Sequence, residues 1–261
     1  MPGLVTYEVD ENVALIGLNR PEKRNAINDA LLLELRDVLA EAGDRVEAAV
    51  LFGHGQNFSA GLDLGELADR LTPEGQAPRK RRPRHLWHST FDLLARGNFP
   101  VVCALHGATI GGGLELASAA HIRVADETTF FGLPEGQRGI FVGGGGSVRT
   151  QRIIGYPMMA DMMLTGRILG VEEARRCGLA QYVTPPGGAV EKAKELARII
   201  AGNVPQTNWM ITNVLPRMND LSHDDGLFME YLNTSMTRPP EARKRLKDFL
   251  EKKAPALARP E

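Results

Sequence analysis

The sequence has little cysteine, few aromatic residues and almost no net charge, and each shortage excludes a class of protein. Only two cysteines occur in 261 residues, Cys103 and Cys177, and their spacing fits neither a disulfide framework nor a zinc site. The six histidines form no cluster with metal-ligand spacing. A formal net charge of −1 gives no electrostatic reason to expect nucleic acid or a membrane as a partner. We therefore expect no metal site, reduced cysteines and a small-molecule ligand.

Long apolar runs are also missing, and no stretch is long enough to span a bilayer. The first residues carry Glu8, Asp10 and Glu11 and do not show the charged-then-apolar layout of a secretory signal. Hydrophobic residues make up 43% of the chain and charged residues 24%, which is typical of a folded protein with a sizeable core. We expect a cytoplasmic protein with one large domain, or one domain with a helical appendage.

The first half of the sequence predicts short strands that alternate with helices. Leu4–Val9 and Val13–Leu18 form a candidate hairpin, and Asn28 is placed to cap a helix that Gly43 closes. Further strands are expected at Ala48–Phe52, Val101–Leu105, Ile122–Ala125 and Thr129–Phe131, with a helix from about His85 to Arg96. Leu133–Gly136 is predicted to be a turn.

The second half is predicted to be mostly helical. A glycine-rich loop, Gly139–Gly146, opens a helix at about Ser147. Helices are then expected at Met158–Thr165, Val171–Cys177, Ala189–Ala201, Gln206–Met218, His223–Thr234 and Glu241–Lys253. Strands followed by long helices indicate a spiral of strand–strand–helix units with a helical region at the end.

The most informative stretch is Pro100–Ala120, where an apolar strand leads to three glycines and a small-residue helix. Glu115 is the only formally charged residue between Gly107 and Ile122, and burying an unpaired carboxylate is costly. Glycines at a helix start leave free N–H groups accessible to an anionic ligand. One interpretation is a site that stabilises an oxyanion and moves a proton. The other is a tight backbone crossing with a glutamate that complements the helix dipole.

Other catalytic motifs do not fit. Ser59 and Ser147 lack the glycine pattern of a nucleophile elbow, and neither glycine run matches a nucleotide-binding loop. The basic run Arg79-Lys80-Arg81-Arg82, followed by Arg84, lies between prolines and predicts a surface loop that is either solvated or able to hold phosphates.

Several motifs together resemble the crotonase superfamily, the enoyl-CoA hydratases and isomerases. They are Asn19-Arg20-Pro21, Asn25–Asn28, Phe58–Leu64, His106-Gly107, Gly111–Ala117, Phe131–Glu135, Gly139–Gly146, Leu164-Thr165-Gly166 and Gly178-Leu179. The resemblance covers nearly the whole chain in order. It implies an α/β fold, a crotonase-like spiral of repeated ββα units at 1–200 that carries the CoA and catalytic site, and a C-terminal helical region for trimerisation at 201–261.

The resemblance also implies roles for individual residues. The backbone N–H groups of Leu62 and Gly112 would form an oxyanion hole for a thioester enolate. Glu115 would deprotonate the attacking water, and Glu135 would protonate the α-carbon. The substrate and its CoA would contact Arg24, Ala26, Ala60, Gly61, Asp63, Leu64, Gly111, Pro134 and Gly143. No separate cofactor is implied, because CoA is part of the substrate.

Departures from the family pattern leave the acyl group undetermined. Gly136-Gln137-Arg138 follows the second glutamate where apolar residues are usual, Val142 replaces a usual proline, and Gly65 replaces a lysine. The resemblance implies a homotrimer or hexamer that hydrates a 2-enoyl-CoA. The alternatives are a double-bond isomerase, which needs one glutamate, and a non-catalytic relative that binds CoA or RNA, which the near-zero charge disfavours.

Overall fold

A computed structural model describes residues 3–43, 45–71, 86–236, 240–251 and 253. The basic run from Arg79 to Arg84 lies outside these residues. The chain divides into two compact units, Met1–Gly202 and Asn203–Glu261. Within the described ranges, no helix is both long and apolar enough to cross a bilayer.

The first unit contains two sheets. The larger sheet has the strand order β1-β2-β3-β4-β6-β9 and consists of β1 (Val5–Asp10), β2 (Val13–Leu18), β3 (Ala48–Gly53), β4 (Val101–Leu105), β6 (Ile122–Asp126) and β9 (Tyr182–Thr184). The smaller has the order β5-β7-β8, with β5 (Ala108–Ile110), β7 (Phe130–Gly132) and β8 (Ile168–Gly170). The predicted hairpin is confirmed, since β1 and β2 pair antiparallel, and the rest of the larger sheet is parallel.

Helices connect these strands and form the second unit. The first unit holds the 3₁₀-helix η1 (Pro21–Lys23), α1 (Asp29–Ala42), α2 (Leu64–Leu71), α3 (Leu86–Arg96), α4 (Gly112–Ala119), α5 (Glu135–Arg138), α6 (Gly146–Thr165), α7 (Val171–Arg176) and α8 (Ala189–Ala201). The second holds α9 (Pro205–Asn213), α10 (Leu215–Met218), α11 (His223–Met236) and α12 (Pro240–Leu250). As predicted, the Asn28 side chain caps α1 by accepting a hydrogen bond from the N–H of Leu31 at 3.0 Å.

The middle of the first unit repeats one pattern. β4 adds to the larger sheet, β5 to the smaller sheet, and α4 follows; β6, β7 and α5–α6 then repeat this order. Each turn of the chain therefore contributes one strand to each sheet before a helix covers them. This is the α/β spiral of ββα units that the resemblance implied.

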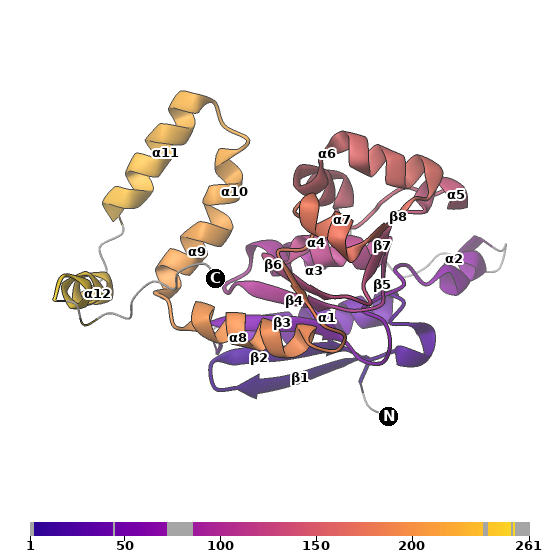
Figure 1. Ribbon diagram of the computed structural model, residues 1–261, viewed down its shortest axis with the longest axis horizontal. Coiled ribbons are helices and arrows are strands. Elements are labelled where there is room, and N and C mark those ends of the chain that lie inside the picture. The colour runs from indigo at the N-terminus through magenta and orange to yellow at the C-terminus, as the bar shows by residue number, and fades with distance from the viewer. Residues whose placement is uncertain (1–2, 44, 72–85, 237–239, 252, 254–261) are drawn as a thin grey trace. The chain divides into compact units, whose positions relative to one another are not determined.

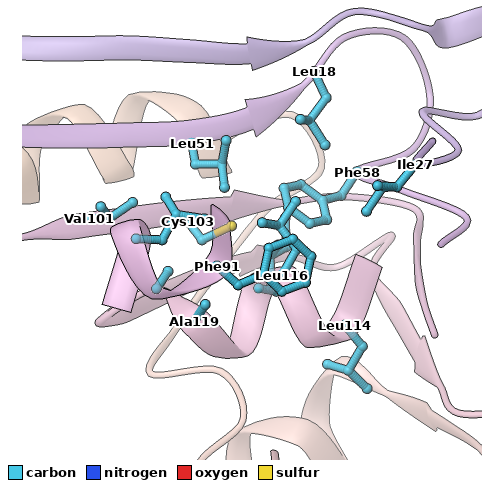
Figure 2. Packing of buried hydrophobic residues seen from close by; sticks show 14 of the residues in the cluster. Leu18, Ile27, Leu51, Phe58, Phe91, Val101, Cys103, Leu114, Leu116 and Ala119 are labelled. Atoms are coloured by element: carbon cyan, nitrogen blue, oxygen red, sulfur yellow. The ribbon is translucent and has the colours of Figure 1, made fainter. Parts of the chain in front are cut away.

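The central parallel strands β3 and β4 are buried on both faces, as their nearly continuous apolar sequences require. Val50, Val102 and Ala104 pack on one face against α8, which lies alongside this sheet in Figure 1. Alternate residues such as Leu51 and Cys103 point to the opposite face, where Figure 2 shows them beside Phe91 of α3 and Leu116 of α4. The sheet thus fixes the positions of α3 and α4, the two helices that bear on the site.

The structure corrects the sequence prediction in three places. The three-residue strands β5, β8 and β9 were not predicted, because they are too short to show an alternating pattern. The stretch predicted as a turn is partly helical, since Glu135 begins α5 with Pro134 as its N-cap. The helices predicted near Ser147 and at Met158–Thr165 are joined in α6, with a kink at Gly155 just before Pro157.

Candidate active site

The candidate site lies where the loop before α2 crosses the start of α4. Gly61 has φ of +84°, and a Cβ there would lie 2.5 Å from the carbonyl oxygen of Ile110 and 3.0 Å from the nitrogen of Gly112. Only glycine combines this conformation with so close an approach of two backbones. A Cβ on Gly112 would in turn lie 3.4 Å from the nitrogen of Leu62. The crossing therefore brings the nitrogens of Leu62 and Gly112 close together.

The pairing with Ile27 turns the Leu62 N–H toward this crossing. Ile27 donates to the carbonyl of Gly61 at 2.7 Å and accepts from the N–H of Asp63 at 2.9 Å. In such a parallel bridge the residue between the two bonded positions, here Leu62, points its own N–H away from Ile27. Gly112 is the first residue of α4, so its N–H has no partner within the helix. Neither N–H donates a hydrogen bond among the described residues, and both are available to an oxygen atom.

Trp87 of α3 covers the crossing and was not identified from the sequence. A Cβ on Gly112 would lie 2.7 Å from Cζ3 of the Trp87 indole, so the ring packs directly on the glycine. The indole also meets Phe91 edge-to-face, with ring centroids 5.5 Å apart. Trp87 is half-buried, and it supplies an apolar wall beside the two N–H groups.

Glu115, in the first turn of α4, is 3% exposed and is held by the second glycine-rich loop. Its Oε2 accepts the N–H groups of Gly144 and Gly146, each at 2.7 Å, and its Oε1 accepts the N–H of Gly143 at 3.2 Å. From the sequence this loop was described as a glycine-rich segment that opens a helix. The structure shows that its backbone binds the carboxylate.

Glu135 is the first residue of α5 and is 5% exposed. Its carboxyl group lies against the start of α4, because a Cβ on Gly111 would be 3.1 Å from Glu135 Oε1. Its buried Oε2 has no hydrogen-bond partner among the described residues. A buried oxygen without a partner is costly in a purely structural carboxylate.

The two carboxyl groups lie in different electrostatic environments. Burial, together with the nearby charge of Glu115, raises the pKa of Glu135 to about 7. Burial also raises the pKa of Glu115 above its usual value, and the three N–H donors, with a smaller contribution from neighbouring His88, oppose that rise. The N–H donors therefore stabilise the ionised form of Glu115, whereas burial and the charge of Glu115 favour the protonated form of Glu135.

The residues predicted to contact CoA lie on two paired segments. The Ala60 N–H donates to the carbonyl of Arg24 at 2.9 Å, and the Ala26 carbonyl accepts from Arg20. Asp63 is another predicted contact, and its carboxylate forms a 3.0 Å ion pair with Arg20 and accepts the Glu66 N–H at the start of α2. Leu64 begins α2 and is exposed.

The remaining predicted contacts surround the N-terminus of α4. Gly111 is its N-cap, Pro134 precedes Glu135, and Gly143 faces Glu115. The predicted site residues therefore form one group, in which the paired segments and the two carboxyl groups meet at the glycine crossing. Among the described residues no group of three or more His, Cys, Asp or Glu side chains has the arrangement of a metal site.

Comparisons with known proteins show which family the chain belongs to. The family model for enoyl-CoA hydratase/isomerase matches residues 8–259. The 2,3-dehydroadipyl-CoA hydratase of Escherichia coli is 32% identical, with 94% of each chain covered. A crystal structure from Rhodopseudomonas palustris, assigned as an enoyl-CoA hydratase, has a TM-score of 0.86 at 43% identity, covering 96% of this chain and 95% of that one. An enoyl-CoA hydratase structure from Bacillus anthracis has a TM-score of 0.86 at 30% identity, covering 97% and 98%. The chain belongs to the enoyl-CoA hydratase/isomerase family of the crotonase superfamily and is an enzyme of the hydratase type.

Proposed function

We propose that this enzyme adds water across the double bond of a 2-enoyl-CoA thioester, using Glu115 and Glu135 as a base and an acid. The observation that carries the proposal is a pair of buried carboxyl groups beside two backbone N–H groups: Glu115 accepts three N–H donors, whereas Glu135 has a buried oxygen without a partner among the described residues. Hydration needs a base for the water and a proton for the α-carbon, and a site with one ionised and one protonated carboxyl supplies both.

The thioester oxygen would bind the N–H groups of Leu62 and Gly112, which stabilise it as it gains negative charge in the enolate. Glu115 takes a proton from water while the water oxygen bonds to the β-carbon. Glu135 gives its proton to the α-carbon, which completes the addition of one H and one OH. CoA is carried by the substrate, so no separate cofactor is required.

A screen of enoyl-CoA thioesters with short, branched and aryl acyl groups tests this proposal. We expect at least one thioester to lose its conjugated absorbance and to give a product heavier by one water. An isomerase would give a product of unchanged mass. Binding of CoA thioesters or RNA by this protein, with no conversion of any thioester, would contradict the enzymatic proposal.

We also propose that the active form is a homotrimer or a pair of trimers. Helices α9–α12 expose many large apolar side chains, among them Trp209, Ile211, Leu215, Leu227, Phe228 and Tyr231. Apolar surface of this extent is typical of contacts between subunits. Light scattering at micromolar concentration should give three or six times the mass of one chain, and a monomeric mass would contradict the proposal. Both cysteines are free thiols, which suits a reducing cytoplasm.

A further inference from the structure

Glu115 is held by a run of four glycines, Gly143–Gly146, and the structure shows what holds that run. Glycine loses more conformational freedom on ordering than any other residue, so such a loop does not keep its shape unaided. Arg149 of α6 donates from Nη1 to the carbonyl of Gly144 at 3.0 Å. The same Gly144 donates its N–H to Glu115. One glycine therefore links the arginine to the carboxylate.

The arginine is itself fixed from a second helix. Arg149 Nη2 forms an ion pair with Asp92 of α3, and the guanidinium packs against Gly145, whose φ is +96°. On the α3 side, a Cβ on Gly144 would lie 2.6 Å from Cε2 of Phe91. The loop is thus enclosed between Phe91 and Asp92 on α3 and Arg149 on α6.

We propose that Arg149, oriented by Asp92, is a positioning residue that keeps the three N–H groups of the Gly143–Gly146 loop directed at Glu115. Neither side chain touches the carboxylate, and the Arg149 side chain is only 19% exposed. The inference rests on the proposed function, since it assigns to this pair the task of keeping the catalytic base ionised and aligned.

Removing Arg149 should impair the base in two ways. A loop that no longer aligns its N–H groups leaves Glu115 buried with fewer donors, so its pKa rises further. The carboxylate also loses its fixed orientation, and small misplacements of a catalytic group reduce the rate strongly. The charged or titratable groups around Glu115 are His88 on α3, Glu135 on α5 and, behind the loop, the Asp92–Arg149 pair.

The first test is Arg149→Met, with kcat and KM measured across pH. We expect kcat to fall by about 10–100-fold with little change in KM, and the acid limb of the pH profile to move to higher pH. Arg149→Lys keeps the charge without the planar guanidinium group. Its kcat and its acid limb should therefore lie between those of wild type and Arg149→Met. The control is Arg167→Met, which removes an arginine paired with Asp161 and Glu173 near the end of α6 and should leave the acid limb in place.

Asp92→Asn separates positioning from simple charge effects. If only charges mattered, removing the negative Asp92 would lower the pKa of Glu115. If the pair positions the loop, the loss of Asp92 releases Arg149, and the acid limb moves to higher pH as in Arg149→Met. A shift to lower pH in Asp92→Asn, or an unchanged kcat and acid limb in Arg149→Met, would overturn the proposal.

A direct titration keeps this inference separate from the proposed reaction. Carbon-13 NMR of glutamate carboxyl groups, with Glu115→Gln for assignment, follows the protonation of Glu115 without any turnover. We expect its midpoint to rise in both Arg149→Met and Asp92→Asn. If wild type hydrates no thioester but the midpoint still rises, the proposed function fails and the positioning role stands. If wild type is active and the midpoint is unchanged in both variants, the positioning role fails alone.

Discussion

Glu115→Gln and Glu135→Gln are each expected to slow hydration by on the order of 10²–10⁴-fold, the loss typical of a general acid–base group. Glutamine matches glutamate in size, but it cannot take a proton from water or deliver one to carbon. Steady-state kcat and KM with one good enoyl-CoA substrate measure the effect. KM should change little, because neither carboxyl group is placed to bind the CoA portion.

The double variant tests whether the two groups act as one unit. We expect the fold-loss in kcat of Glu115→Gln/Glu135→Gln to be much smaller than the product of the two single fold-losses. The reason is that the effects of substituting residues that serve the same transition state are not additive. An isomerase would show asymmetry, with one substitution abolishing turnover and the other mild. Near-native hydration by Glu115→Gln would refute the role of Glu115 as the base.

The two substitutions should differ in their effect on stability, which separates folding from chemistry. Glutamine at 115 offers one acceptor oxygen, so its NH₂ group must face at least one of the three loop N–H donors. A buried donor left without an acceptor costs about 1–3 kcal/mol. At 135 the buried Oε2 has no partner among the described residues, so little is lost. Thermal unfolding should therefore show Glu115→Gln as the less stable variant, although both lose activity.

The pH dependence of Glu135 has a definite sign. Its pKa is about 7 in the folded enzyme against an ordinary 4.5, so the folded state binds more protons between these values. The stabilisation that Glu135 contributes to the folded state at low pH is therefore lost as the pH rises from about 4.5 to 7. Above that range this contribution no longer changes with pH. Hydration should instead fall as the pH rises through about 7, where Glu135 of the folded enzyme loses its proton. Glu135→Gln should remove this contribution to the pH dependence of unfolding.

The regular elements were predictable because their patterns are local. The β1–β2 hairpin, the α1 cap at Asn28 and the bounds of α8 all follow from spacing and capping residues. The short strand β5 and the short helix α5 were missed, since three or four residues carry no readable period. The isolated charge of Glu115 marked the site, because burying a carboxylate requires a partner or a function.

What the sequence could not give is the set of partners that come from elsewhere in the chain. Trp87 belongs to a helix predicted only as a core element, and nothing local indicates that its ring rests on Gly112. Asp92 and Arg149 are ordinary helix-surface residues until the fold brings them together behind the glycine loop. The loop itself was noticed as glycine-rich, but its N–H groups point at Glu115 only because α4 and α6 pack together.

Gly112→Ala is the second substitution for which we expect a large effect. The new Cβ would lie 2.7 Å from the Trp87 ring and 3.4 Å from the Leu62 nitrogen, so it would occupy space beside the two N–H groups. The loss of one oxyanion-hole donor reduces kcat by about 10²–10³-fold in other enzymes, and we expect a loss of that size here. The shape of the pH profile should not change, because no titrating group is altered.

Gly170→Ala is a matched control, since a Cβ there meets nothing within 4 Å and φ is −77°. It should retain wild-type kcat. Thermal unfolding of Gly112→Ala should be compared with both proteins, because a crowded Trp87 ring also costs stability.

Trp87 allows the cause of the loss to be identified. If Gly112→Ala acts only by displacing the indole, adding Trp87→Leu should relieve the crowding and restore most of the activity. If the Cβ itself obstructs the approach of the thioester oxygen, stability should recover in the double variant while kcat stays low. We expect the second result, because the Cβ remains within van der Waals contact of the Leu62 nitrogen whatever residue stands at 87. Full recovery of kcat would show that the oxyanion is not bound between these two N–H groups.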